Sequence, residues 1–365
     1  LAACHKPGET DPLEHTRALL RSHPVIDGHN DLPWAIRGET GPPGDLDAYD
    51  LAATTSGDTD LARLRAGGVG GQFWSVYVPA GLAEGAARIQ LEQIELTRRM
   101  IARYPQDLAL ATTVAEVEGA MARGRIASLL GIEGGHVIED SLGALRAYHA
   151  LGVRYMTLTH SATLRWADSS GEDRRHGGLT SFGEEVVREM NRLGMLVDLS
   201  HVSPETMDDA LRVAEAPVIF SHSSARALCD HPRNVPDSIL RRLSDNGGVV
   251  MVTFVAAFVS PEYSAASQPL WKEFEERIKD IEDPEERRAL WKELKARMPE
   301  IPVALGEVAD HVEHVRRVAG VDHIGLGGDY DGNDSWPEGL EDVSGYPNLF
   351  AELIRRGWSD ADLAK

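Results

Sequence analysis

Hydrophobic residues cluster along the chain in short runs that are bounded by glycine, proline or polar residues. Several runs contain almost no polar residue, which is typical of strands buried on both faces of a parallel sheet. The pattern predicts eight strands: Val25–Asp27, Gln72–Val78, Ile126–Ile132, Arg154–Thr159, Leu196–Ser200, Val218–Ser221, Val249–Phe254 and His323–Gly327.

Segments with apolar residues at helical spacing lie between most of these strands, as in Ala86–Tyr104, Phe182–Leu193 and Pro204–Ala214. Ser203 followed by Pro204 is typical of a helix start, because serine caps the first turn and proline fits the first helical position. Strands that alternate with helices predict an α/β fold, a (β/α)8 barrel of the TIM type. An open doubly wound sheet is the alternative, and the absence of a GxGxxG motif after the first strand argues against its dinucleotide-binding version.

The charged stretch from Ser260 to Pro302 interrupts this alternation after the seventh strand. Apolar residues recur in it at helical spacing on both sides of Pro284, which predicts an inserted helical hairpin at about 261–302. The hairpin either only packs on the barrel or forms a wall of the active site, since the active-site loops of such barrels lie on that side. We further predict a tether and a leading helix in residues 1–22 and a single barrel domain in residues 23–365.

The composition limits the classes of partner. The chain has 365 residues, of which 42% are hydrophobic, and it is long enough for a large core. No segment approaches the roughly 20 consecutive apolar residues that span a bilayer. The net charge of −21 argues against nucleic acid and anionic lipid surfaces as partners, because both require a basic face.

The two cysteines lie far apart in the sequence and predict no disulfide framework. Cys229 is interpreted as a small buried residue. The first residues, LAAC, place Cys4 as in a bacterial lipobox, whose cysteine carries a lipid anchor, and a polar segment suited to a tether follows. We therefore expect a lipoprotein of the bacterial cell envelope, with a cytoplasmic location as the alternative. Because the chain begins with Leu1 and not with methionine, we expect the sequence to be part of a longer one.

Residues suited to metal binding or acid–base chemistry follow the ends of the predicted strands. His29 and Asp31 follow the first strand, and residues two apart in an extended chain point to the same side. Later strand ends add Glu133, His160, His201, His222 and Asp329. Because the carboxyl ends of the strands of a (β/α)8 barrel face one pocket, we expect these side chains to meet there.

Imidazoles and carboxylates that share a buried pocket predict a cation, because burying an unpaired carboxylate is costly. The donor set suits zinc, manganese or iron. The candidate ligands outnumber the three protein ligands that are typical of one catalytic metal, so two metals bridged by a shared carboxylate are predicted. His136 lies one loop turn beyond Glu133 and is interpreted as a residue that does not bind metal.

Nine ordered blocks run almost from one end of the chain to the other: VIDGHNDLPW, GGQFWSVYVP, ASLLGIEGGH, RYMTLTH, LVDLSHVS, APVIFSHSSAR, RNVPD, GLGGDYDG and EGLEDVSGYP. Together they resemble the membrane dipeptidase family, the renal dipeptidase type of zinc peptidase. We expect a bacterial member of this family.

The resemblance implies two Zn²⁺ ions per chain and a role for each candidate ligand. His29 and Asp31 would bind one zinc ion. His201 and His222 would bind the other, and Glu133 would bridge the two.

The resemblance also implies three residues that act on the substrate. His160 would help to polarise the scissile carbonyl, Arg233 would hold the terminal carboxylate, and Asp329 would carry a proton from the bridging water to the leaving amine. The implied activity is hydrolysis of dipeptides by a hydroxide that bridges the metals, with tolerance of a D-residue at the C-terminal position. A homodimer is also expected.

Two other functions stay open. An amidohydrolase acting on a cyclic amide, lactam or lactone would share the metals but would not need Arg233. A binding protein would hold metal for structure only, and Asp329 argues against it because an additional carboxylate has no structural need. Unlike the mammalian relatives, the chain has Ala80 and Ala162 where one disulfide would be, and its Met251–Phe258 segment lacks the aromatic hydroxyl placed there.

Overall fold

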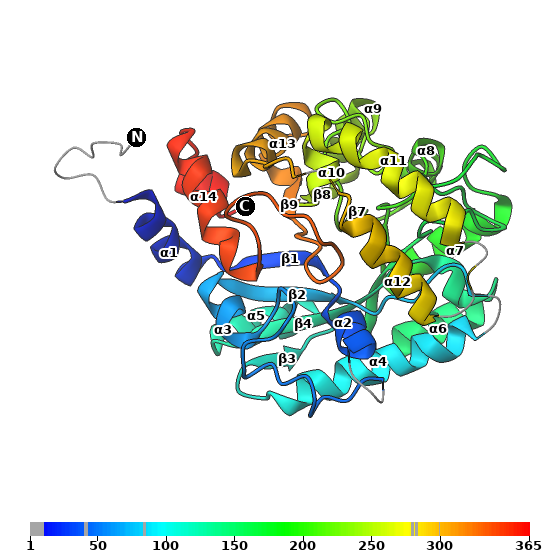
Figure 1. The fold of residues 1–365 in the computed structure, drawn as a ribbon, viewed down its shortest axis with the longest axis horizontal. Helices are drawn as coiled ribbons and strands as arrows, with labels where there is room; N and C mark the ends of the chain where they lie inside the picture. The colour runs from blue at the N-terminus through cyan, green and yellow to red at the C-terminus, as the bar shows by residue number, and fades with distance from the viewer. Residues whose placement is uncertain (1–10, 40–42, 83–84, 279–280, 282–283, 299) are drawn as a thin grey trace.

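The computed structural model describes residues 11–39, 43–82, 85–278, 281, 284–298 and 300–365. Cys4, the predicted lipid site, lies outside the described residues, as does most of the predicted tether. Figure 1 shows the strands in the middle of the molecule with helices around them. The leading helix α1 (Pro12–Ser22) packs against α14 (Tyr346–Arg355). Within the described ranges, no helix is both long enough and apolar enough to cross a membrane.

In the described part of the chain, nine parallel strands form the central sheet. They are β1 (Val25–Asn30), β2 (Val69–Ser75), β3 (Leu108–Leu110), β4 (Ile126–Ile132), β5 (Val153–Thr157), β6 (Leu196–Asp198), β7 (Ile219–Phe220), β8 (Val249–Val252) and β9 (Ile324–Leu326). β2 pairs with both β1 and β4, which closes eight of the strands, all except β3, into a barrel. This closure confirms the predicted barrel and excludes the open sheet.

The largest differences from the predicted strand beginnings concern β3 and β2. β3 was not predicted, and its three residues pair along the first half of β4, while β5 pairs along the second half of the same edge. β2 begins at Val69 instead of the predicted Gln72. Gly70 and Gly71 conceal this start in the sequence, because glycine is depleted in strands. A Cβ at Gly70 would lie 2.6 Å from the Pro24 side chain, so the close approach of the chain to β1 requires glycine.

The strands also end at other residues than predicted. The paired parts of β5, β6 and β8 end before the predicted ends at Thr159, Ser200 and Phe254, because the last residues leave the ladder for the loops above the barrel. β1 instead continues to Asn30, so that His29 lies within the strand and not after it.

The helices surround the barrel, and the three helices predicted between strands, at 86–104, 182–193 and 204–214, are present within two residues of their expected bounds. Those that follow the early strands are α2 (Leu32–Glu39), α3 (Leu61–Ala66), α4 (Ala86–Arg103), α5 (Val114–Ala122), α6 (Leu142–Ala150), α7 (Ser181–Leu193) and α8 (Pro204–Val213). The later ones are α9 (Asp237–Asn246), α10 (Ala256–Val259), α11 (Pro261–Ile278), α12 (Pro284–Lys295), α13 (Leu305–Val318) and α15 (Asp360–Leu363). The Ser203 side chain accepts a hydrogen bond from the Thr206 N–H at 3.2 Å and caps α8 as predicted.

The helices α11 and α12 occupy the charged stretch after β8 and pack together through aromatic side chains. The ring of Trp291 in α12 lies 4.8 Å from that of Trp271 and 5.3 Å from that of Phe274, both in α11. Pro284 begins α12, where its missing N–H costs nothing. Figure 1 shows the two helices side by side across the front of the barrel.

Candidate metal centre

The carboxyl ends of the strands bring the five predicted metal ligands together. We call His29, Asp31, Glu133, His201 and His222 the ligand cluster. Glu133 lies at its centre, because its Oε1 is 2.9 Å from His201 Nε2, 3.4 Å from His222 Nε2 and 3.7 Å from His29 Nε2. Two ligand atoms on one tetrahedral zinc lie about 3.4 Å apart, given metal–ligand distances near 2.1 Å. The spacing in the cluster therefore suits direct binding to a metal.

Three groups of ligand atoms lie close enough to hold an ion. Their members are His29, Glu133 and His222; Glu133, His160 and His201; and His29, Asp31 and Asp329. Glu133 and His29 each belong to two of these groups. The groups join His201 with His160, and His222 with His29. The Nε2 atoms of His201 and His222 also lie 3.0 Å apart, which is close enough for the two to share one ion, as the family resemblance implies.

Unpaired atoms in the cluster also fit a cation. Asp31 Oδ1 is buried and accepts no hydrogen bond from the described residues. The Nε2 atoms of His201 and His222 face each other at 3.0 Å, so at most one of them can donate to the other. A cation would satisfy both kinds of atom, because it accepts lone pairs from carboxylate and imidazole alike.

The pKa shifts in the ligand cluster also indicate that it suits a cation. Burial lowers the pKa of His29, but the charges of Asp31 and Glu133 outweigh burial and raise that pKa to about 10. Burial raises the pKa of Glu133, and the nearby His29 opposes the rise. The pKa values of His201 and His222 fall well below their usual range, with burial as the largest cause. The cluster thus combines a strong demand for positive charge with neutral imidazoles, which are the form that binds metal.

Buried hydrogen bonds turn His222 toward the cluster. The Ser221 hydroxyl donates to Asp198 Oδ2 at 2.6 Å, so its oxygen is free to accept from His222 Nδ1 at 2.8 Å. Thr157 donates to the same Asp198 oxygen. A histidine that donates from Nδ1 keeps the lone pair of Nε2 for a ligand. Sequence reasoning missed Asp198, although a carboxylate inside an apolar strand was a visible signal.

His29 is oriented in a similar way by a residue of another strand. Its Nδ1 lies 2.9 Å from the hydroxyl of Tyr155, a fully buried side chain in β5. The Nε2 atom then faces Asp31 Oδ2 at 3.2 Å. Tyr155 gave no signal in the sequence, because an aromatic residue in a strand is normally part of the core.

His160 lies at the edge of the ligand cluster. Its Nε2 is 3.8 Å from Glu133 Oε1, and its ring packs against those of His201 and Tyr77 at centroid distances of 4.3 and 5.0 Å. Burial lowers the pKa of His160 to about 3, and the charge of Arg233 adds to this effect. The ring is therefore neutral at pH 7 and can donate one hydrogen bond.

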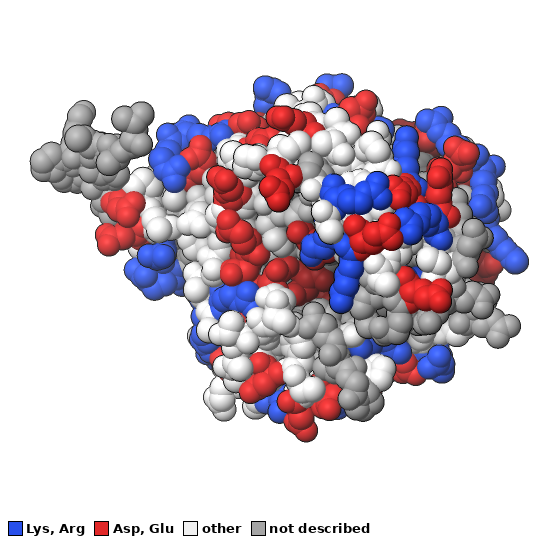
Figure 2. Space-filling view, in the orientation of Figure 1, with Lys and Arg blue, Asp and Glu red and all other residues white. Residues whose placement is uncertain are grey.

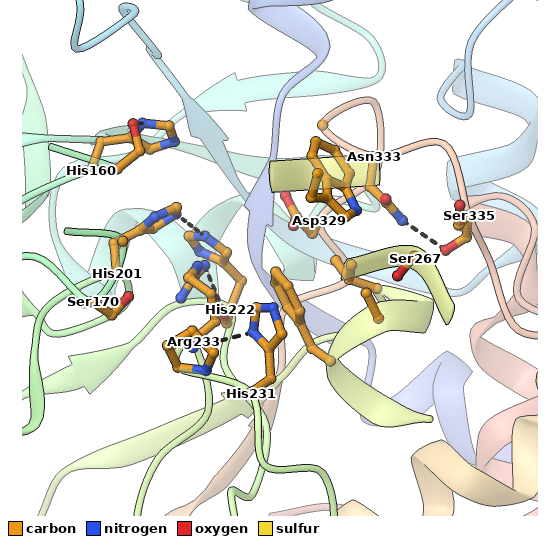
Figure 3. A pocket seen from close by; sticks show the side chains of 18 of the residues that line it. His160, Ser170, His201, His222, His231, Arg233, Ser267, Asp329, Asn333 and Ser335 are labelled. Atoms are coloured by element: carbon orange, nitrogen blue, oxygen red, sulfur yellow. Dashed lines mark hydrogen bonds between the residues drawn. The ribbon is translucent and has the colours of Figure 1, made fainter. Parts of the chain in front are cut away.

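Arg233 places a buried guanidinium in the same pocket. It makes two long hydrogen bonds, from Nη1 to Ser223 Oγ at 3.5 Å and from Nη2 to the His222 carbonyl at 3.3 Å. Its Cζ lies 5.2 Å from the centre of the Phe258 ring. Burial lowers the pKa of Arg233 to about 10, so the group remains charged at neutral pH. Figure 3 shows Arg233 on the same side of the pocket as His201 and His222, with Asp329 across from them.

Asp329 reaches the ligand cluster from the loop after β9. Its backbone has a φ of 66°, in the left-handed region, and its Oδ1 lies 3.9 Å from His29 Nε2. Burial raises the pKa of Asp329 to about 7, although His29 opposes the rise, and this pKa suits a group that both takes up and releases a proton. Gly332 allows the approach, because a Cβ there would lie 2.2 Å from Asp31 Oδ2 and 2.8 Å from Asp329 Oδ1.

The model of the membrane dipeptidase family, peptidase family M19, matches residues 13–365. The chain belongs to the membrane dipeptidase family. The mouse and rat proteins called Dipeptidase 3 are each 42% identical to it over 356 residues, or 96% of the chain. The chain spans 63% and 64% of the lengths of these two relatives.

Solved structures share the fold. The probable dipeptidase PvdM from Pseudomonas aeruginosa aligns with a TM-score of 0.82 over 97% of this chain and 94% of that chain, at 24% identity, which shows the fold alone. A metallo peptidase from Rhodobacter sphaeroides, liganded with a phosphinate mimic of the dipeptide L-Ala-D-Ala, aligns with a TM-score of 0.77 at 25% identity. That alignment covers 93% of this chain and 95% of the other.

The pocket beyond the ligand cluster is lined by residues that the sequence did not single out, although one of the two alternatives predicted for the inserted hairpin was that it forms a wall. The cavity has a volume of about 630 Å³. Residues that line it and were not predicted include Trp34, Tyr77, Ser170, His231, Phe258, Tyr263, Trp271, Asp331 and Asn333. Tyr263 and Trp271 belong to α11, so this helix forms part of the pocket wall.

His136 lies beside the pocket and not among the residues that line it. It is mostly buried, and burial lowers its pKa to about 4. A Cβ at Gly134 would come within 2.6 Å of His136 Nδ1 and 3.1 Å of the His160 Cβ, so glycine allows the two histidines to pack closely there. Among the described residues, the three groups of ligand atoms do not include His136.

Proposed function

We propose that this chain is a binuclear zinc dipeptidase that cleaves the peptide bond of dipeptides. The observation that carries the proposal is Arg233, a buried guanidinium in the same pocket as the ligand cluster, whose hydrogen bonds to the described residues are two long ones. A guanidinium fork suits a carboxylate, and a dipeptide has its free carboxylate one residue beyond the scissile bond. A general amidohydrolase would have no use for this charge.

Zinc, His160 and Asp329 would each have a distinct role in the proposed reaction. Zinc, when bound by the ligand cluster, would lower the pKa of a water molecule and polarise the scissile carbonyl. His160, neutral and near Glu133, would donate a hydrogen bond to the carbonyl oxygen as negative charge develops there. Asp329 would take a proton from the attacking water and pass it to the leaving amine, since its raised pKa permits both steps.

The proposed tolerance of a D-residue at the C-terminal position is supported by one comparison. The Rhodobacter sphaeroides metallo peptidase, 25% identical, was solved with a mimic of L-Ala-D-Ala. Because Arg233 would fix the carboxylate and the cavity of about 630 Å³ is large for a dipeptide, a C-terminal side chain of either configuration has room.

The test is a panel of substrates with purified protein. We expect hydrolysis of L,L and L,D dipeptides, loss of activity with a chelator, and recovery when zinc is added back. Elemental analysis should then give about two zinc ions per chain, as expected for the bridged type of site. Hydrolysis of cyclic amides or lactones in preference to dipeptides would establish the other amidohydrolase function, and a zinc content near one after reconstitution would refute the bridged site.

The proposals on location and assembly rest on the sequence alone. We propose a bacterial envelope lipoprotein anchored through Cys4 that assembles as a homodimer. A full-length precursor expressed in bacteria should fractionate with membranes, and Cys4→Ala should release it or block its processing. A soluble precursor with unmodified Cys4 would contradict the anchor, and a monomer in sedimentation would contradict the dimer.

A further inference from the structure

His231 lines the pocket two residues before Arg233, and neither the ligand cluster nor the proposed roles involve it. Its ring packs on that of Phe258, with centroids 4.5 Å apart at an angle of 32°. The guanidinium carbon of Arg233 lies 5.2 Å from the centre of the same Phe258 ring. One aromatic side chain therefore supports both the imidazole and the guanidinium.

The hydrogen bonds of His231 determine which of its nitrogens carries the proton. The backbone N–H of Arg233 donates to His231 Nδ1 at 3.3 Å. A backbone amide can only donate, so Nδ1 must be the acceptor and the neutral ring carries its proton on Nε2. Burial lowers the pKa of His231 to about 4, and the charge of Arg233 adds to this effect, so the ring is neutral at pH 7.

Figure 3 shows His231 next to Arg233 on the pocket wall, on the side of His201 and His222 and away from Asn333 and Ser335. This is the side where Arg233 would hold the terminal carboxylate. We propose that His231 is a substrate-binding residue that donates its Nε2–H to the terminal carboxylate held by Arg233. The proposal rests on the proposed dipeptidase function.

A neutral donor such as His231 has an advantage over a second cation beside Arg233. The carboxylate offers about four lone-pair sites, and one guanidinium occupies two of them. A second cation would repel Arg233 and the bound metals, whereas a neutral N–H adds a directional hydrogen bond without adding charge. The pair would therefore fix the orientation of the carboxylate and, through it, the distance of the scissile bond from the ligand cluster.

Two variants of His231 distinguish the role of its Nε2–H donor from that of its Nδ1 acceptor. In His231→Asn the amide oxygen reaches the position of Nδ1, so the bond from the Arg233 N–H survives, but nothing replaces Nε2. In His231→Gln the amide nitrogen reaches the position of Nε2, while the Nδ1 acceptor is lost. We expect His231→Asn to raise the KM of a dipeptide about tenfold, the usual effect of losing a hydrogen bond to a charged group, and His231→Gln to raise it less than threefold.

The measurements are kcat and KM for a dipeptide and for its C-terminal amide, with zinc content and thermal stability as checks on folding. The amide lacks the charge, so its hydrolysis should change less than twofold in both variants. His149→Asn, in α6 and away from the pocket lining, is the matched control and should behave as the unchanged protein.

A smaller defect for His231→Asn than for His231→Gln would show that only the support of Arg233 matters, and would overturn the proposal. Equal losses on the dipeptide and on the amide would overturn it as well. If the unchanged protein fails to hydrolyse dipeptides, the proposed function itself is wrong, and this result is distinct from a normal enzyme that is insensitive to His231.

Discussion

The ligand cluster and the helical wall, in which α11 borders the pocket and α12 packs against α11, are held in place in different ways. Cluster residues stand on or just after strands, and buried partners such as Tyr155 and Asp198 set their orientation. The helical wall instead combines exposed side chains such as Trp271, which is 37% exposed, with a few buried ones such as Tyr263 and Leu294. Its Trp291 and Lys295 both contact Asp334 in the loop after β9, at 2.9 and 2.8 Å.

From this difference we infer that the ligand cluster governs the reaction chemistry and that the helical wall governs the choice of substrate. A closed barrel imposes fixed positions on the cluster, because each of its eight strands is paired on both sides. The exposed positions of α11 and α12 lie outside this pairing, so they can change in sequence without disturbing the strands. Figure 2 shows the charged side chains of α11 and α12 beside Asp and Glu residues near the centre of this face. We therefore expect substitutions in the cluster to affect metal and kcat, and substitutions in the helical wall to affect mainly KM.

The largest effect is expected for Glu133→Gln. Glu133 lies within reach of three cluster histidines, so the change should release metal and lower dipeptide hydrolysis by about a hundredfold or more. Elemental analysis and kcat/KM measure the two effects. Asp329→Asn is the matched control, since it should lose activity while keeping more metal, and equal metal loss in both variants would mean that Glu133 is not the bridge.

Asp198→Asn comes next, because it tests whether buried partners stabilise the cluster. The amide accepts the Ser221 hydroxyl less well, so His222 should bind metal more weakly, and losses of this kind are about 10- to 100-fold in affinity. Competition with a chromogenic chelator gives the affinity. Thr157→Val removes another donor to Asp198 but leaves Ser221 and His222 paired, so it should weaken metal binding much less. Identical affinities for the two variants would argue against this orienting role.

Arg233→Ala should impair dipeptides by about tenfold or more in kcat/KM, which is the cost of losing a hydrogen bond to a charged group. Dipeptide amides should be affected little, because they lack the carboxylate. Arg233→Lys keeps the charge without the fork and should fall between the two. His160→Ala, by contrast, should lower kcat for both kinds of substrate. If Arg233→Ala reduced hydrolysis of dipeptides and amides by the same factor, capture of the carboxylate by this residue would be refuted.

The smallest effect is expected for Asp334→Asn, which weakens the attachment of the helical wall. Exposed ion pairs contribute up to about 1 kcal/mol, so the melting temperature should fall by only a few degrees. Zinc content and kcat should stay unchanged, with KM raised at most severalfold. A loss of bound zinc in this variant would remove the distinction between the two regions.

The cluster was predictable because parallel strands in a barrel end at the same side. The order of apolar runs gave the eight barrel strands, and the residues after them gave His160, His201 and His222. β3 escaped because three residues such as Leu108–Leu110 are too few to form a distinct pattern. The start of β2 was not predicted because it contains glycines. Gly70 is needed for the close contact with Pro24, and this contact cannot be recognised in the sequence.

The walls of the pocket were less predictable, for a different reason. His231, Tyr77 and Ser170 stand on loops, where no periodicity tells which way a side chain points. Trp271 carried a helical pattern that indicates only that one face of α11 is apolar, not that this face borders a cavity. The long-range contacts of such residues arise from packing of the whole chain, which local patterns do not encode.

The left-handed backbone of Asp329 has a consequence for evolution and engineering. A non-glycine residue with a φ of 66° carries a backbone cost of about 1–2 kcal/mol, and its carboxylate is also buried. Asp329→Gly should therefore raise the melting temperature of the metal-free protein while abolishing its proposed chemistry. A selection for heat resistance alone would drive this position toward an inactive protein, so libraries built for stability should keep Asp329 fixed.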